Sequence, residues 1–235
     1  MTWQNIAWCG RGDGSYTQCQ SSAYVLGNHS AVIVDLFDTS AATIASLKAG
    51  GRRVICYYSA GTWENWRVDK DNLTSVKRAV MDGWVGEWWL DLTSAANRSV
   101  VQAAMTWRLQ LAQAKGCEAV EPDNVDCFGN TACRQGRALA DAKADQLAYN
   151  QWTAGAAHAH GLAVGLKNDL DQVAALEPLY DFAVNEECRQ YNECNVLLPF
   201  LNHNKAVFQT AYQGYTEATL TTWCESTDKI GRAHV

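Results

Sequence analysis

The stretch SVVQAAMTWRLQLAQAKGCEAVEPDNVD, residues 99–126, contains one full copy of the pattern that decides the fold. Val101, Met105 and Leu109 recur at helical spacing in its first part, which predicts an amphipathic helix. Gly116 ends that helix, as glycine often does at a helix C-terminus. The letters CEAVEP that follow read as a short buried strand, and a group of carboxylates comes directly after it. A helix, a glycine and a strand with acidic residues at its end therefore form one unit.

The same unit recurs along the chain and supplies eight apolar runs. The runs lack clean alternation of apolar and polar residues, which is typical of strands covered on both faces. Strands that alternate with helices are expected to be parallel. The runs are residues 2–6, 31–37, 52–58, 87–92, 117–122, 162–167, 181–187 and 205–211, of which the first and fourth have the poorest helical segments beside them. We predict an α/β fold, a single-domain (β/α)8 barrel. An open doubly wound sheet is the alternative, but no GxGxxG motif supports it.

Polar side chains gather where these runs end. A (β/α)8 barrel builds its active site at the C-terminal ends of its strands, so it would bring them to one mouth. A mouth rich in carboxylates and aromatics, without a set of metal ligands, is typical of glycoside cleavage by two carboxyl groups. The candidates at or just after strand ends are Asp35, Asp38, Tyr57, Ser59, Asp91, Glu121, Asp123, Asn124, Asp126, Lys167, Asn168, Asn185, Glu186, Glu187 and Tyr212.

Several of these residues have a structural role as an alternative. Asp38 would serve equally well as the N-cap of the helix that begins in TSAATI. Glu121 directly precedes Pro122, and would brace a loop or bind substrate. Lys167 is a candidate Schiff-base nucleophile. We favour the alternative that it pairs with neighbouring carboxylates or orients the substrate.

Aromatic residues and histidines add further candidates. Most of the ten tryptophans are expected in the core. Trp63 and Trp66 in GTWENWR, and Trp88 and Trp89, are the better candidates for stacking on a sugar or a cation. The five histidines form no HExxH motif, so we expect no metal site and no cofactor.

Charge and composition exclude some classes of partner. The net charge of −6 argues against nucleic acid, and no apolar run approaches the length of a membrane span. Hydrophobic residues make up 48% of the chain and predict a substantial core. We expect a monomer.

Nine cysteines are many for a reduced cytosolic protein of this size. Cys56 lies within an apolar run, and we expect it to be a buried free thiol. Three close pairs indicate disulfides that staple loops in a secreted protein. They are Cys9 with Cys19, Cys127 with Cys133, and Cys188 with Cys194.

Both ends of the chain are unusual for a secreted protein. No signal peptide follows Met1. The last residues, IGRAHV at 230–235, match the translation of a common sequencing adapter. We therefore expect residues 1–229 to form the domain, truncated at both ends, and we set residues 230–235 aside as non-native.

A set of motifs in this order resembles one known family. The motifs are VDLFDTSAATIASLKAGGRRVICYYSAGTWENWRVD, WVGEWWLDL, VEPDNVD, DQLAYNQW, GLAVGLKND, NEECRQYNEC and NKAVFQTAY. From about Val32 to Tyr212 they resemble glycoside hydrolase family 114, the endo-α-1,4-polygalactosaminidases of bacteria and fungi. The resemblance implies a (β/α)8 barrel, secretion, and hydrolysis of partly deacetylated galactosaminogalactan-type polymers.

The resemblance also singles out two carboxylates. The family's catalytic pair falls on Asp123 in EPDN and Glu186 in NEEC. We assign Asp123 as the nucleophile and Glu186 as the general acid/base, with reversed roles or an inverting reaction as alternatives. The proton donor needs a raised pKa, and we expect Glu121 and Glu187 to supply the negative charge that raises it.

The implied substrate agrees with the acidic chain. Polygalactosamine is a polycation near neutral pH, so carboxylates that do no chemistry are expected to bind its ammonium groups, and aromatic rings to add cation–π contacts. Glu64, Trp66 and Arg67 join the strand-end residues as candidate substrate contacts. The basic loop TACRQGRALADAK is longer than the family pattern leads us to expect, which leaves the subsite preference open.

Two other functions remain as alternatives. One is a carbohydrate-binding barrel with weak or no catalysis, and the other is an α-glycosidase that acts on a neutral polysaccharide. A polygalactosaminidase would require free amines on the polymer, whereas an α-glycosidase of neutral polysaccharides would not.

Overall fold

The computed structural model describes residues 3–5, 9–10, 16–17, 30–211 and 231–234. Eight strands form one parallel sheet in the order β1–β4–β5–β9–β10–β11–β12–β13. The strands are β1 (Trp3–Asn5), β4 (Ala31–Asp35), β5 (Arg53–Ser59), β9 (Ala119–Asp123), β10 (Ala163–Lys167), β11 (Phe182–Glu186), β12 (Ala206–Ala211) and β13 (Gly231–His234). Because the first and last strands in this order also contact each other, the sheet curls into a barrel. The predicted (β/α)8 fold is confirmed.

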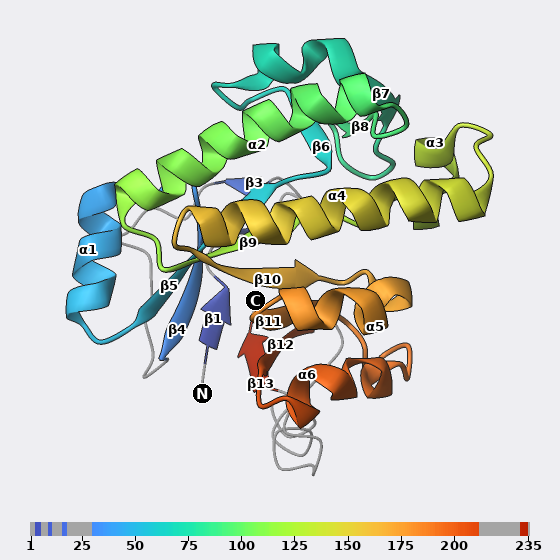
Figure 1. Ribbon diagram of the computed structural model, residues 1–235. Coiled ribbons are helices and arrows are strands. Elements are labelled where there is room, and N and C mark those ends of the chain that lie inside the picture. The colour runs from blue at the N-terminus through green and yellow to red at the C-terminus, as the bar shows by residue number, and fades with distance from the viewer. Residues whose placement is uncertain (1–2, 6–8, 11–15, 18–29, 212–230, 235) are drawn as a thin grey trace.

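Helices cover the outside of this sheet. They are α1 (Ala41–Ala49), α2 (Ala95–Lys115), α3 (Thr131–Arg134), α4 (Leu139–Ala159), α5 (Val173–Leu176) and α6 (Leu198–Asn202), with short 3-10 turns at 70–76, 127–129, 170–172, 177–179 and 194–197. The two long helices, α2 and α4, lie side by side across the sheet (Figure 1). In the described part of the chain, no helix has both the length and the apolar character needed to cross a bilayer.

Helix α2 shows how the sequence pattern sets these elements. The Ser94 side chain caps its N-terminus by accepting a hydrogen bond from the Asn97 N–H. Gly116 ends it in the left-handed region at φ +86°, which favours glycine. Met105 and Leu109 are fully buried against the sheet, as their spacing predicts.

Strand residues alternate between two cores. Val32 and Val34 of β4 face the larger core, between the sheet and the helices, whereas Ala31 and Ile33 face a smaller core inside the barrel. Both faces of β4 are therefore buried, which explains why its sequence shows no alternation.

The fourth predicted strand, residues 87–92, is wrong as a barrel strand. In the structure β8 (Glu87–Leu90) lies between β6 (Thr62–Glu64) and β7 (Lys77–Val80) in a separate antiparallel sheet. A parallel neighbour of β5 needs a long crossover, usually a helix, and the only helical element in residues 62–86 is one 3-10 turn. β5 instead pairs directly with β9.

The eighth barrel strand comes from the segment that we set aside. Residues 231–234 form β13, which pairs in parallel with β12 and places Phe208 opposite Gly231. The first predicted strand is present as β1, paired with β4. A further two-stranded antiparallel sheet joins β2 (Cys9–Gly10) to β3 (Tyr16–Thr17).

Two predicted disulfides are present, and one cysteine was misassigned. Cys127–Cys133 and Cys188–Cys194 each close a short loop, with Cα–Cα distances of 5.8 and 4.8 Å. The third predicted pair, Cys9 with Cys19, lies outside the residues whose side chains are described.

The prediction of a free thiol at Cys56 is wrong. Cys56 in β5 is bonded to Cys117, just before β9, at a Cα–Cα distance of 6.0 Å. The two residues are 61 positions apart in sequence and become neighbours only because β5 pairs with β9.

Candidate active site

One lysine lies at the centre of three carboxylates at the mouth of the barrel. Lys167, the last residue of β10, has its Nζ 3.1 Å from Glu121 Oε1, 3.1 Å from Asp123 Oδ1 and 3.3 Å from Glu186 Oε1. These carboxylates come from β9 and β11, the two strands that flank β10. The parallel order of the strands therefore brings together four residues from three separate segments of the sequence.

Glu121 is the fully buried member of this cluster, whereas Asp123 and Glu186 are partly exposed. The side chains of Asp123 and Glu186 are 19% and 31% exposed. Glu121 is 0% exposed. Its burial raises its pKa to about 7, helped by the charges of Asp123 and Glu186 and opposed by Lys167. Asp123 and Glu186 can thus meet a substrate, and Glu121 supports Lys167 from below.

Hydrogen bonds fix the two exposed carboxylates. The Tyr57 hydroxyl donates to Asp123 Oδ2 at 3.2 Å, and burial raises the pKa of that phenol well above its ordinary value. The Asn168 amide donates to Glu186 Oε2 at 3.1 Å, and its Oδ1 accepts from the Glu186 N–H at 2.9 Å. Asn185 also donates to Asn168 Oδ1, at 3.3 Å. Each carboxylate is therefore oriented by a neighbour that the sequence had placed at a strand end.

The chain after β5 holds the end of β9 in place. The N–H groups of Ala60 and Gly61 donate to the Asp123 carbonyl at 2.8 and 3.1 Å. A Cβ on Gly61 would lie 1.7 Å from the Asn124 carbonyl oxygen, so only glycine permits this approach. Asn124 in turn donates to the Ser59 hydroxyl at 2.9 Å. Ser59 and Asn124 thus help to position the backbone of Asp123.

A cavity of about 400 Å³ opens beside Glu186. Its walls include two loops that disulfides close, Cys127–Cys133 and Cys188–Cys194. Half of its lining residues are acidic, and none is Lys or Arg. The lining residues are Asp126, Phe128, Gly129, Asn168, Asp169, Leu170, Asp171, Asn185, Glu186, Glu187, Tyr191 and Glu193. The cavity is therefore suited to a cationic ligand.

Two acids of the cavity have raised pKa values. Burial, followed by the charge of Asp126, raises the pKa of Asp169 to about 8. Burial, followed by the charge of Asp123, raises the pKa of Asp126 to about 6. Asp169 was not among the sequence candidates. It precedes a 3-10 turn, where an Asp often acts as the N-cap. Here it makes no side-chain cap hydrogen bond.

Three predicted substrate contacts lie in a buried ion network. Arg67 donates to both oxygens of Asp35 at 3.0 and 2.8 Å, and to Glu64 at 2.9 Å. None of these three residues is more than 4% exposed. The expectation that they bind substrate is not supported by their position, because they satisfy one another beneath the surface.

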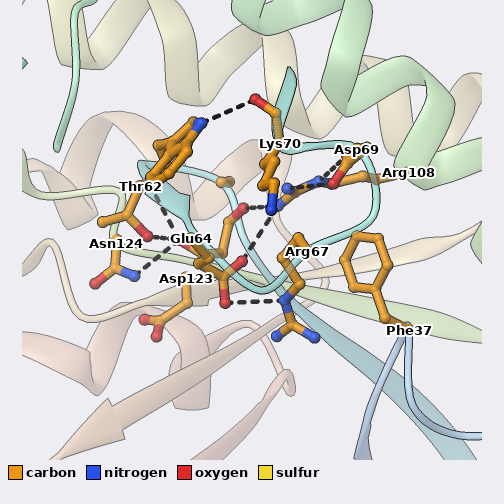
Figure 2. A network of polar contacts seen from close by, with 12 residues as sticks. Phe37, Thr62, Glu64, Arg67, Asp69, Lys70, Arg108, Asp123 and Asn124 are labelled. Carbon is orange, nitrogen blue, oxygen red and sulfur yellow. Dashed lines mark hydrogen bonds and ion pairs between the residues drawn. The ribbon is translucent and has the colours of Figure 1, made fainter. Parts of the chain in front are cut away.

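A second arginine extends this network. Arg108 of α2, fully buried, donates to both oxygens of Asp69 at 2.8 and 3.1 Å and lies 3.7 Å from Glu64. Figure 2 shows Arg108 beside Asp69 and Phe37 beside Arg67, with Asp123 and Asn124 on the far side of Glu64. The network therefore lies behind the Asp123 side of the mouth.

The remaining candidates have different surroundings. Asp38 is partly exposed, 3.5 Å from Arg67. Asp91 follows β8 in the antiparallel sheet and pairs with Arg78 at 3.3 Å, so it is not a barrel strand end. Trp66 is 42% exposed. Tyr212 lies outside the described residues.

The other tryptophan candidates differ in exposure. Trp63 and Trp88 pack edge to face at 5.1 Å, and Lys77 Nζ lies 4.3 and 4.0 Å from their ring centroids. Trp89 is buried at 4% exposure. Lys77 of the protein itself thus lies over the Trp63 and Trp88 rings, which were expected to bind a sugar or a cation of the substrate.

Comparisons with known proteins agree with this geometry. A crystal structure of Aspergillus fumigatus Ega3 in complex with galactosamine matches 100% of this chain and 89% of its own, at 32% identity and a TM-score of 0.82. The glycoside hydrolase domain of PelA from Pseudomonas aeruginosa matches 100% of this chain and 93% of its own, at 13% identity and a TM-score of 0.72, and so shares the fold. A comparison with curated proteins found no match.

The family itself follows from the sequence model of glycoside hydrolase family GH114, which matches residues 2–235. With the 32% identity to Ega3 over the whole chain, this match shows the family. The chain is a glycoside hydrolase and belongs to family GH114.

Proposed function

We propose that this protein is a secreted, endo-acting hydrolase of α-1,4-linked galactosamine polymers, with Asp123 as the nucleophile and Glu186 as the general acid/base. The observation that carries the proposal is the shared contact of both carboxylates with one ammonium. Because Asp123 Oδ1 and Glu186 Oε1 lie 3.1 and 3.3 Å from Lys167 Nζ, they are at most 6.4 Å apart. Retaining glycosidases hold their carboxyls about 5–5.5 Å apart and inverting ones about 6.5–9.5 Å. The limit for this pair of oxygens is compatible with a retaining mechanism, which we propose.

For the two acids we propose the roles that the family resemblance implies. In the first step Asp123 bonds to the anomeric carbon as the glycosidic bond breaks, and Glu186 gives its proton to the departing oxygen. In the second step a water molecule attacks the anomeric carbon, and Glu186 takes a proton from that water. The bond between the carbon and Asp123 breaks, and the Asp123 carboxylate leaves. The Lys167 ammonium and the Tyr57 hydroxyl contact the two oxygens of Asp123 and orient its carboxylate. Glu186, the more exposed acid, borders the cavity from which water can enter.

The acidic cavity supports a cationic substrate. Half of its lining residues carry carboxylates, and galactosamine bears a protonated amine near neutral pH. Ega3, at 32% identity, was crystallised with galactosamine. Three disulfides in the described part of the chain support secretion, because such bonds persist in oxidising compartments.

The test is reducing-end release from a deacetylated α-1,4-galactosamine polymer. We expect activity in the parent, and a loss of about a thousandfold or more in both Asp123→Asn and Glu186→Gln, as for removal of an essential group. A rapid fall in polymer length at low conversion would show endo action. Asp141→Asn, at an exposed position of α4, is the matched control and should retain full activity.

The stereochemistry of the first product tests the retaining mechanism. NMR of the fresh product should show the α-anomer. A β-anomer would contradict the assignment of Asp123 as a nucleophile. A folded parent that binds the polymer but releases no ends would favour a carbohydrate-binding role, and equal cleavage of a neutral polymer would favour an α-glycosidase of other specificity.

A further inference from the structure

The strongest unexplained feature is one buried carboxylate in the wall of the acidic cavity. Asp169 is 2% exposed and lies two residues after the end of β10. Its Oδ2 accepts a hydrogen bond from the Asn150 amide at 2.8 Å. Its Oδ1 is buried and has no hydrogen-bond partner among the described residues. Burying an oxygen without a hydrogen bond costs free energy of folding. The presence of Asp169 in the wall of this cavity therefore calls for a functional explanation.

Asp126 is the second carboxylate of this wall. It follows β9, lines the same cavity and is partly exposed. The two acids interact, because the charge of Asp126 contributes to the raised pKa of Asp169. The charges of Lys143 and Lys167 oppose the raised pKa values of Asp169 and Asp126 but do not cancel them. A cation placed against both carboxylates would remove the remaining cost of ionising them side by side.

We propose that Asp169 and Asp126 form a subsite for the protonated amino group of one sugar unit, next to the unit that is cleaved. The inference rests on the proposed function and deepens it, since it names the residues that select the amine. Asn168 and Glu186 line the same cavity, so a sugar held there would be adjacent to the general acid/base.

The surroundings favour an ammonium group over a metal ion. Among the described residues, no cluster of three or more His, Cys, Asp or Glu side chains is arranged to hold a metal. The cavity also contains the rings of Phe128 and Tyr191, which suit the apolar face of a sugar and a cation beside it. The Asn150 amide already occupies Asp169 Oδ2, which leaves Oδ1 for a hydrogen bond from the substrate.

With a subsite of this kind, the position of cleavage depends on which sugar units of the polymer are acetylated. An N-acetylated unit is neutral and larger at the same position, so it would leave the carboxylate of Asp169 unpaired. Sites built to pair with a polar group reject analogues that lack it. Products of a partly acetylated polymer should therefore carry a free amine at one fixed position relative to the cut.

The decisive variant is Asp169→Asn. Asparagine has the same shape, can still accept the hydrogen bond from Asn150, and tolerates the left-handed backbone of this residue at φ +44°. We would measure kcat/KM on fully deacetylated and partly N-acetylated polymer and locate the amines in the products by mass spectrometry. Asp126→Asn is the second variant, and Asp141→Asn is the matched control.

We expect Asp169→Asn to lower kcat/KM on the deacetylated polymer by about 10- to 100-fold, with a much smaller loss on acetylated polymer. The fixed position of the free amine should disappear, and Asp126→Asn should give a smaller change in the same direction. An unchanged product pattern would overturn the proposal. An equal loss on both polymers with a lowered Tm would also overturn it, because that result indicates a structural role.

A binding measurement separates this inference from the proposed function. Calorimetry would compare galactosamine with N-acetylgalactosamine on the parent and on Asp169→Asn. Tighter binding of the amine to the parent, lost in the variant, would support the subsite even if no polymer were cleaved. Equal binding of both sugars to the parent would overturn the subsite even if the polymer were cleaved.

Discussion

The two halves of the barrel mouth contain similar charged residues and use them differently. Around β4 and β5, acids and arginines form a network whose members are all nearly inaccessible to solvent. The members are Asp35, Glu64, Arg67, Asp69 and Arg108. Around β9 to β11, the acids surround Lys167 and adjoin an acidic cavity.

The charged residues of the two halves differ in exposure because different segments of the chain cover them. Residues 62–90 form the antiparallel sheet and its connections after β5, and they supply Glu64, Arg67 and Asp69 to the network. Helix α2 packs against this segment and adds Arg108. The half around β9 to β11 has no comparable sheet over it in the described part of the chain. A charged residue at a strand end therefore faces substrate only where no inserted segment buries it.

The largest effect on stability should come from a substitution in the buried ion network. Arg108→Met removes both hydrogen bonds to Asp69 and leaves that buried carboxylate uncompensated. Removing one partner of a buried pair costs about 3–5 kcal/mol, so the free energy of unfolding in denaturant should fall by that amount.

An exposed arginine gives the matched control for this variant. Arg53, paired with Glu118, has a side chain that is 71% exposed. Arg53→Met should change the free energy of unfolding by less than about 1 kcal/mol. Equal effects of the two variants would contradict the distinction between a buried network and a surface pair.

Lys167→Met tests the other half, where the effect should fall on activity. Without the ammonium, Asp123 and Glu186 lose the positive charge that contacts both of them. We expect kcat to fall by about 100- to 1000-fold, which is about 3–4 kcal/mol of barrier. Lys48→Met, outside the mouth, should leave kcat unchanged. A loss confined to KM would contradict a role in the chemistry.

The pH dependence of stability should show the buried acid beneath Lys167. Because burial raises the pKa of Glu121 from 4.5 to about 7, the folded protein holds a proton that the unfolded chain releases. Stability is therefore lost as pH rises from about 4.5 to about 7, by up to about 3 kcal/mol. Glu121→Gln should remove this loss.

The measurement is the free energy of unfolding at pH 4.5 and at pH 7.5. The difference between the two values should be smaller in Glu121→Gln than in the parent. The partly exposed Glu118 provides the control, and Glu118→Gln should behave as the parent does. The same pH dependence in Glu121→Gln and the parent would show that Glu121 ionises normally.

The sequence predicted the parts of the site that depend on strand positions. The barrel strand ends carry Glu121, Asp123, Lys167 and Glu186, and parallel pairing alone brings them together. The assignment of Asp123 and Glu186 as the catalytic pair came from family resemblance and stays a proposal. Burial was the part that local sequence could not provide, because it depends on packing by distant segments.

Particular residues show this limit. Arg67 and Asp35 are 32 positions apart, and only the segment after β5 brings the arginine over the acid. Cys56 looked like an ordinary core residue because its partner Cys117 lies in a different unit of the chain. Asp169 was not a candidate at all, and a hydrogen bond from Asn150 of α4 holds it in the cavity wall. Each error concerns a contact between units that are distant in sequence.

The smallest predicted effect concerns a cavity residue that the sequence did not indicate. Tyr191 is 62% exposed and lines the cavity from the loop that Cys188–Cys194 closes. An aromatic contact with a sugar is worth about 0.5–1.5 kcal/mol, so Tyr191→Ala should raise KM by about 2- to 10-fold with little change in kcat. Tyr191→Phe keeps the ring and should bind as the parent does. If both variants raised KM equally, the hydroxyl would be the contact, and Tyr191 would recognise sugar by hydrogen bonding.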